Sequence, residues 1–151
     1  MSKGIKFKDN TYLDSSGITH NRTPLKDILN NGVLRSKIIS ATRDGQGANG
    51  NVSYIGVGFR PTSMRCLSNI DGTLYQSDGF TDSAGASQCI YQAAANVNYN
   101  GNGIVAMYSN YSAWYQMGTL VSFDADGFTL NWSKVGTPPA GTMQLRFICY
   151  K

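Results

Sequence analysis

One stretch, SFDADGFTLNW over Ser122–Trp132, constrains the fold of this chain more than any other segment. Apolar and polar residues alternate on both sides of its centre: Thr119, Val121 and Phe123 share one side upstream, and Phe128, Leu130 and Trp132 share one side downstream. Such a period of two predicts a pair of strands, each with one buried face. Asp126-Gly127 between the two runs predicts a tight hairpin, because a type I′ turn needs a positive φ at both central residues.

The same centre, Asp124-Ala125-Asp126-Gly127, is also compatible with the start of a calcium-binding loop. A loop of that kind needs further oxygen ligands and a closing Glu at its twelfth position, between two helices. The twelfth residue counted from Asp124 is Val135, and the sequence contains no Glu. The sequence therefore favours the turn over a cation site, and it predicts neither a metal nor a cofactor.

The composition is typical of an all-β protein with many turns. The chain has 151 residues, 41% of them hydrophobic and 15% charged, with 17 Gly and only Asp as acidic residue, and Asp-Gly recurs at 44–45, 71–72 and 78–79. We predict about eight or nine strands in an antiparallel, jelly-roll-like β-sandwich. The expected strands cover residues 36–42, 51–59, 62–69, 85–95, 103–109, 117–123, 128–133 and 142–151, and the Gly-rich residues 43–50 are expected to form a flexible loop.

An extended arm and one short α-helix are predicted to precede this head. Residues 1–22 are polar and irregular in pattern, whereas residues 23–32 carry Thr23 as N-cap, Pro24 at the first helical position and Gly32 after the end. We therefore divide the chain into an arm, residues 1–32, and a head, residues 33–151. The apolar residues and the histidine of the arm are candidates for an anchor or oligomer interface: Phe7, Tyr12, Leu13, Ile18, His20, Leu25, Ile28 and Leu29.

The positive charge is concentrated near the N-terminus. Residues 1–43 carry eight Lys and Arg against three Asp, a net of +5, and residues 44–151 carry five against six, a net of −1. Because most aromatic residues lie in the second part, the pattern argues against nucleic-acid binding. A basic arm suits contact with an acidic protein surface, and a solvated arm is the alternative. No signal peptide or membrane span is expected.

Three cysteines, Cys66, Cys89 and Cys149, match no metal-binding spacing. Each lies in a strand-like run, where a reduced cysteine behaves as a small apolar residue. We therefore expect free thiols and synthesis in a reducing cytoplasm.

Catalytic residue patterns are weak, and we expect no enzyme. The single histidine, His20, lies in the arm, and most Asp residues accompany Gly in turns. Asp78 and Asp82 are the least explained carboxylates, and they would be the acids of a polysaccharide depolymerase if the chain were one.

Aromatic residues among Asn, Ser and Gly mark the candidate binding surface, within NYNGNGIVAMYSNYSAWYQ over Asn98–Gln116. Tyr and Trp offer stiff contact area with a polar handle, which suits the stacking of sugar rings. The candidate glycan-binding residues are Tyr99, Tyr108, Tyr111, Trp114 and Tyr115. The alternative is that about half of them belong to the core or to a subunit interface.

Two segments resemble virion proteins of tailed bacteriophages. The leader GIKFKDNTYLDSSGITHNRTPLKDIL is similar to the N-terminal segment of phage fibre and receptor-binding proteins. YIGVGFRPTSM and the C-terminal GTLVSFDADGFTLNWSKVGTPPAGTMQLRFICYK resemble a β-domain of phage virion proteins. The matching positions of that domain are Gly58, Phe59, Pro61, Asp126, Gly127, Phe128, Thr129, Leu130 and Trp132.

This resemblance implies a short fibre or fibre tip on the virion, probing the host surface. It implies a homo-oligomer, expected to be a trimer, whose residues 1–32 bind other virion proteins and whose head binds a host glycan. The chain departs from long fibres because it has almost no repetitive shaft. Head fibre, capsid decoration and baseplate-proximal protein therefore remain as alternatives.

Overall fold

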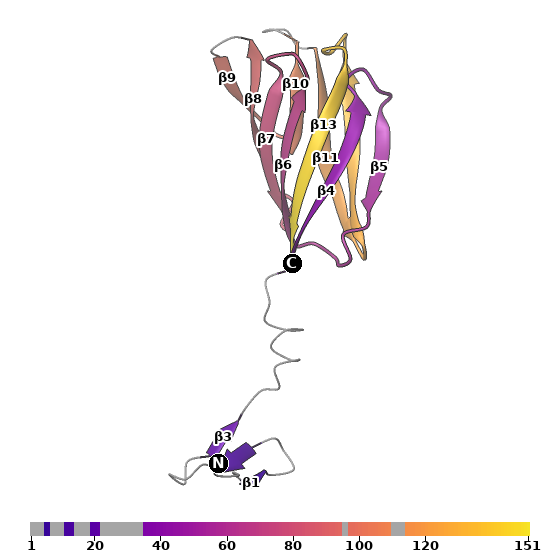
Figure 1. Ribbon diagram of the computed structural model, residues 1–151. Coiled ribbons are helices and arrows are strands. Elements are labelled where there is room, and N and C mark those ends of the chain that lie inside the picture. The colour runs from indigo at the N-terminus through magenta and orange to yellow at the C-terminus, as the bar shows by residue number, and fades with distance from the viewer. Residues whose placement is uncertain (1–4, 7–10, 14–18, 22–34, 95–96, 110–113) are drawn as a thin grey trace. The chain divides into compact units, whose positions relative to one another are not determined.

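The structure, a computed structural model, describes residues 5–6, 11–13, 19–21, 35–94, 97–109 and 114–151, and it divides the chain into two compact units, Met1–Leu34 and Arg35–Lys151 (Figure 1). The first unit contains three short antiparallel strands, β1 (Ile5–Lys6), β2 (Thr11–Leu13) and β3 (Thr19–Asn21). The expectation of an irregular arm is wrong at these strands, where Tyr12 pairs with His20. The helix predicted over 23–32 and the side chains of the arm's interface candidates lie outside the described residues.

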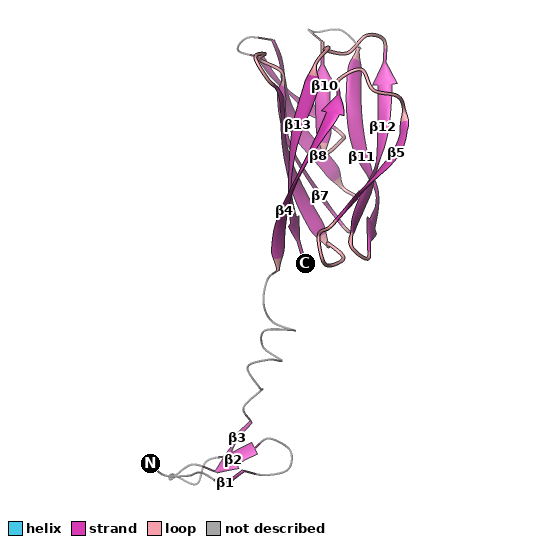
Figure 2. Cartoon of the chain, turned by 45° about the vertical axis from the view of Figure 1, so that its right-hand side comes forward, coloured by secondary structure: helices cyan, strands magenta, loops and turns pink. Residues whose placement is uncertain are grey.

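The second unit, which we call the head, consists of two antiparallel sheets, and its described residues contain no helix (Figure 2). The six-stranded sheet has the order β4-β13-β6-β7-β8-β9, and the four-stranded sheet has the order β10-β11-β12-β5. The strands are β4 (Ser36–Asp44), β5 (Gly50–Ile55), β6 (Ser63–Ile70), β7 (Gln76–Asp82), β8 (Ser87–Ala94), β9 (Val97–Gly101), β10 (Val105–Tyr108), β11 (Tyr115–Asp124), β12 (Gly127–Val135) and β13 (Thr142–Tyr150). The all-β antiparallel prediction for the head is confirmed.

The larger of two hydrophobic clusters in the head lies between the two sheets. Phe147 of β13 contacts Tyr54 of β5 and Phe128 of β12, with ring centroids 5.0 and 4.8 Å apart. The alternation expected downstream of the hairpin is confirmed, since Phe128, Leu130 and Trp132 are all fully buried. Burial of each large apolar side chain of this kind contributes about 1.5–3 kcal/mol to folding.

The predicted hairpin is confirmed, but its turn lies one residue earlier than expected. Asp124 pairs with Gly127, so Ala125 and Asp126 form the turn and Gly127 begins β12. Glycine is needed at this position both for its φ of 156° and for close packing, because an added Cβ would overlap the backbone of Tyr54 on β5.

Both carboxylates of this turn have structural partners. Asp124 accepts hydrogen bonds from the hydroxyls of Ser122 and Thr129, at 2.7 and 2.8 Å. Asp126 accepts from two backbone N–H groups of the β5–β6 loop, those of Gly56 at 3.2 Å and Gly58 at 2.5 Å. Across the described residues, no group of three His, Cys, Asp or Glu side chains is placed to hold a metal ion. The turn predicted for this stretch is confirmed by the pairing of Asp124 with Gly127, and Asp126 fixes the β5–β6 loop to the hairpin.

Strand β7 was not predicted, and the turn expected at Asp78-Gly79 is wrong because both residues lie inside this strand. Its inward side chains are Ser77, Gly79 and Thr81, so no apolar alternation marks it. The reason is a close approach by the segment before β10. A Cβ added at Gly79 would lie 2.7 Å from the carbonyl carbon of Ile104 and closer still to its oxygen.

The three cysteines are free and buried, as predicted. Burial raises the pKa of the Cys66 thiol, and it raises the pKa of Cys89 and of Cys149 to about 11. All three thiols are therefore neutral and act as apolar core groups near neutral pH.

Candidate binding surface at the distal end of the head

The first and last residues of the head lie at one end, and several of its loops lie at the other. The backbone N–H of Lys151 donates to the carbonyl of Arg35 at 3.0 Å, so the head begins and finishes at the same end. Strand β4 runs from there to Asp44, so the loops 45–49, 71–75 and 136–141 lie at the opposite end, together with Ser109 and Trp114 next to β10 and β11. We call this opposite end the distal end; it is the upper end of the head in Figure 1.

Three tyrosines form a stack near the distal end. The rings of Tyr91 and Tyr108 lie 4.4 Å apart with an interplanar angle of 11°, and those of Tyr108 and Tyr115 lie 4.9 Å apart. Tyr91 is buried, whereas Tyr108 and Tyr115 are half-buried. Burial, followed by the neighbouring Tyr115 and Cys89, raises the pKa of Tyr108, so its hydroxyl is neutral near pH 7. The stack thus belongs to the core on one side and to the surface on the other.

Trp114 is the most exposed described member of the predicted cluster, with 50% of its surface accessible. Its carbonyl accepts a hydrogen bond from the backbone N–H of Ser109 at 3.0 Å, which closes the β10–β11 connection. Its ring lies against Gly136, where an added Cβ would be 2.5 Å from the indole Cγ and Nε1. Glycine at this position, with φ of 61°, therefore lets the indole lie flat on the backbone.

The structure brings together only part of the predicted cluster. Register in the β10–β11 hairpin places Tyr108 opposite Tyr115, and Trp114 precedes Tyr115 directly. Tyr99 lies in β9 opposite Tyr91, but its side chain, like all of Tyr111, lies outside the described residues. Sequence reasoning missed Tyr91, whose only signal is its place in the alternation of a strand that it shares with Cys89.

The Gly-rich loop at the distal end is held rather than free, so the expectation of a flexible loop is wrong. Three of its carbonyls accept hydrogen bonds from long side chains of other strands or of its own base. These bonds run from Arg43 to Ala48 (2.5 Å), from Gln116 to Gly47 (2.8 Å) and from Lys134 to Gln46 (2.8 Å). A loop fixed in this way loses little conformational entropy when a ligand binds beside it.

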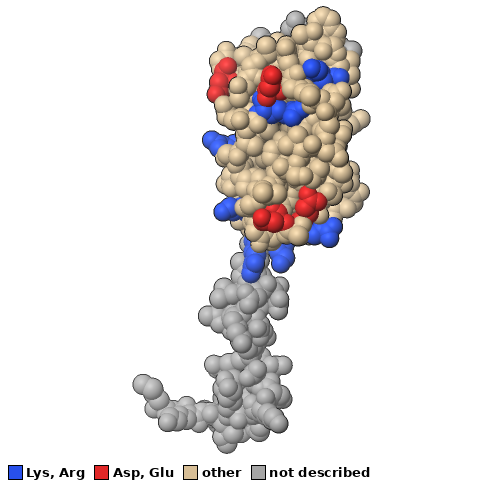
Figure 3. Space-filling view, turned by 90° about the vertical axis from the view of Figure 1, so that its right-hand side faces the viewer, with Lys and Arg blue, Asp and Glu red and all other residues tan. Residues whose placement is uncertain are grey.

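Arg43 contributes to this support from inside the sandwich. Its guanidinium lies 4.4 Å from the ring centroid of the buried Trp132, a cation–π contact. Desolvation lowers the pKa of Arg43, although the group stays charged at any physiological pH. Figure 3 shows one flank of the head, where charged side chains gather toward the two ends and the band between them is largely uncharged.

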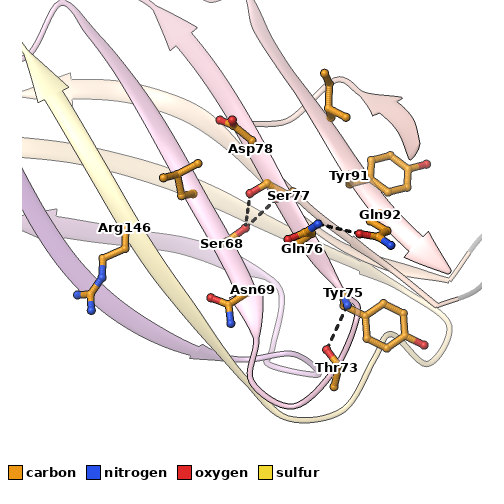
Figure 4. A pocket seen from close by; sticks show the side chains of 12 residues that line it. Ser68, Asn69, Thr73, Tyr75, Gln76, Ser77, Asp78, Tyr91, Gln92 and Arg146 are labelled. Carbon is orange, nitrogen blue, oxygen red and sulfur yellow. Dashed lines mark hydrogen bonds between the residues drawn. The ribbon is translucent and has the colours of Figure 1, made fainter. Parts of the chain in front are cut away.

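The surface is hollowed over the outer face of β6, β7 and β8 (Figure 4). It encloses about 610 Å³ and is lined by polar side chains such as Asn69, Gln76 and Gln92, with Leu67 and Ile90 beside them. The Gln76 amide donates to Gln92 at 2.7 Å, and the hydroxyls of Ser68 and Ser77 lie 2.7 Å apart beneath them.

The carboxylates considered for hydrolysis have other partners. Arg65 donates to both oxygens of Asp78, with Nε 2.8 Å from Oδ1, and this hydrogen bond holds the pKa of Asp78 below its ordinary value. A catalytic acid needs a raised pKa instead. Asp82 lies four residues further along β7, about 13 Å away at 3.3 Å per residue. That separation exceeds the roughly 5–9.5 Å of glycosidase carboxylate pairs, and Asp82 accepts from the N–H of Ala84 at 2.9 Å.

Comparison with known protein families, with curated proteins and with solved structures finds no match to this chain. None of the described segments is a helix long and apolar enough to cross a membrane.

Proposed function

We propose that this chain is a structural protein of a tailed-phage virion, a short fibre or fibre tip that adsorbs to a glycan on the host surface. Residues 1–32 are the anchor to other virion proteins, and the head, displayed on the particle surface, makes the host contact. The observation that carries the proposal is the exposed Trp114, next in sequence to the half-buried Tyr115 of the tyrosine stack, at the end of the head opposite Arg35. The residues proposed as the anchor precede Arg35, and Arg35 lies at the other end of the head from Trp114.

We further propose that the head is a jelly-roll-like sandwich. In support, β4 pairs with β13 and β5 pairs with β12, so the last strands return beside the first in nested order. The middle of the chain departs from a regular jelly roll, since β6 to β9 form one meander and β10 to β12 another. A two-sheet sandwich of this kind provides a rigid support for loops at its ends.

The recognition chemistry would be that of sugar binding without catalysis. The apolar face of a sugar ring stacks on the open side of Trp114, and the hydroxyls of Tyr108 and Tyr115 are available at the border for hydrogen bonds. One such site binds weakly, and several copies on one fibre raise the apparent affinity by about 10²–10⁴. We therefore propose a non-enzymatic homotrimer that needs no cofactor, nucleic acid or membrane insertion.

A polysaccharide array tests this function. The fluorescently labelled full chain is applied to purified bacterial capsular, cell-wall and lipopolysaccharide samples, next to the variants Trp114→Ala and Val121→Ala. Val121 is similarly exposed, at 52%, but lies on β11 at a bulge away from the stack. We expect binding to at least one sample, lost by about tenfold or more in Trp114→Ala and unchanged in Val121→Ala.

The other outcomes of this experiment each oppose the proposal. Release of reducing ends from a bound polysaccharide would identify a depolymerase. Equal binding by Trp114→Ala would move the site away from the distal end. Absence of binding to every sample and to intact cells would favour a decoration protein that has no ligand.

A further inference from the structure

The outer face of the six-stranded sheet exposes large apolar side chains in the middle of its strands. Ile38 of β4, Leu67 of β6, Phe80 of β7 and Ile90 of β8 are 62%, 41%, 48% and 57% exposed. Each lies inside its strand rather than at an end, and Ile148 of β13 is half-buried beside them. We call these five residues the apolar outer patch.

Strand register places the apolar outer patch around the central Arg65–Asp78 ion pair. Leu67 and Ile90 lie on either side of Asp78, and Phe80 is the next residue of β7 on the same face. In the other half of the sheet, Ile38 lies opposite Ile148. Residues on one face of neighbouring strands lie about 5–8 Å apart, which is within reach of these side chains.

The outer face of the four-stranded sheet has a different character. Its central side chains are polar and bond one another across strands: Ser53 with Thr129 at 2.8 Å and Asn131 with Asn51 at 2.8 Å. Its exposed apolar residues lie at irregular points, with Ile55 at the end of β5 and Val121 at the bulge of β11. This face has the pattern of a solvated sheet surface, and the six-stranded sheet does not.

We propose that the outer face of β4-β13-β6-β7-β8 packs against a second copy of this chain. On their outer side, the strands of this face carry Arg65 and Arg146 on β6 and β13, Asp78 and Asp82 on β7, and Asp44 at the end of β4, two positive and three negative charges. Arg65 and Asp78 pair within one chain. The charges left for a second copy are therefore of opposite sign on the two sides of β6, with Arg146 on β13 and Asp82 on β7, so a copy turned by half a turn sets the basic side of one face over the acidic side of the other.

The central ion pair does not prevent such packing. Arg65 and Asp78 neutralise each other within one chain, so burying them together leaves no single charge without a partner. Two hollows of about 610 and 630 Å³ lie over this face and share Asp78 and Ile90 in their linings. They provide space for side chains of the opposite copy.

The area of the face suits a stable contact. Five strands spaced about 4.8 Å apart and about seven residues long at 3.3 Å each cover roughly 550 Å² in projection. Side-chain relief increases this area toward the roughly 800 Å² per partner of a standard interface. The inference rests on the proposed oligomeric fibre and names the surface through which its heads associate.

Sedimentation velocity on the full chain tests the surface with a matched pair of variants. Ile90→Lys places a charge in the patch, and Val121→Lys places the same charge at a similarly exposed position on the other sheet. We expect the wild type and Val121→Lys to sediment as a multiple of 16.4 kDa and Ile90→Lys to sediment at 16.4 kDa. Unchanged far-ultraviolet circular dichroism shows that the variants are folded, and Ile90→Ser is the milder substitution if the lysine variant is not.

The outcomes separate this inference from the proposed function. An Ile90→Lys variant that keeps the wild-type mass, or a Val121→Lys variant that dissociates equally, overturns the surface. A monomeric wild type that still binds polysaccharide overturns the surface and leaves the adsorption function standing. An Ile90→Lys variant that stays oligomeric but loses polysaccharide binding would make this face the receptor site and refute the association of copies.

Discussion

Replacement of Gly79 by alanine should destabilise the head far more than an ordinary change of glycine to alanine in a strand. The added Cβ would lie 2.7 Å from the carbonyl carbon of Ile104, and ordinary carbon contacts need about 3.5 Å or more. The segment around Ile104 must therefore move by roughly 1 Å. That movement strains two bonds that hold it, from Ile104 N–H to Gly118 (2.9 Å) and from Ala106 N–H to the Ser77 hydroxyl (3.2 Å).

The expected magnitude follows from these contacts. Overpacking costs about 1–3 kcal/mol, and two weakened hydrogen bonds add about 1 kcal/mol each. The free energy of unfolding should fall by about 3–5 kcal/mol in total, which lowers the melting temperature by roughly 10–20 °C for a unit of this size. Urea titration of the full chain followed by tryptophan fluorescence measures the change, because Trp132 is fully buried in the core.

Gly101→Ala is the matched control. A Cβ at Gly101 would meet only side-chain atoms, the nearest being the Cys89 sulfur at 3.0 Å, and side chains can move aside. Its cost should stay below about 1.5 kcal/mol. If Gly79→Ala and Gly101→Ala unfold at the same urea concentration, then the close approach of Ile104 does not explain the glycine in β7.

Three further predictions concern the hairpin carboxylate and the titratable groups. Asp126→Ala removes the acceptor of two backbone N–H groups of the β5–β6 loop and should lower the unfolding free energy by about 1–2 kcal/mol, measured by urea titration. An unchanged free energy would show that these two hydrogen bonds do not stabilise the loop. Because Arg65 lowers the pKa of Asp78, this pair stabilises the fold above about pH 4 and its contribution is lost as the pH falls through the lowered pKa, by under about 1 kcal/mol for an exposed pair; Asp78→Asn should flatten that acid limb of stability against pH. Because burial raises the pKa of all three thiols, that of Cys149 to about 11, the wild type should lose stability as the pH rises above about 8.5. Cys149→Ala removes one of the three groups and should lose correspondingly less, and an equal loss would contradict this cause.

Local patterns predicted the strands whose buried faces are apolar. Strand β12 is an example, since Phe128, Leu130 and Trp132 point into the core from alternate positions. Strand β7 could not be predicted in this way because its inward residues, Ser77 and Gly79 among them, are small where the chain before β10 crosses it. The cause of that composition is a contact with a residue 25 positions later in the chain, which a local pattern does not contain.

The candidate site was predictable to a similar extent. Tyr108 and Tyr115 meet because a hairpin connects them, and hairpin partners are close in sequence. Tyr91 joins the stack from another sheet, and the side chains that fix the Gly-rich loop come from positions 69 and 88 residues away from their acceptors. Such long-range partners determine which residues meet at the distal end and which hydrogen bonds hold its Gly-rich loop, and a local pattern does not reveal them.

We propose that this chain is an exposed component of a phage particle, and antibody labelling of intact particles tests this proposal. Antibodies raised against the full chain are applied with gold conjugates to intact, purified particles of the phage that encodes it and viewed by electron microscopy. The proposal predicts gold at regular positions on the particle surface. Particles that stay unlabelled, while the same antibodies detect the chain in extracts of infected cells, would contradict it.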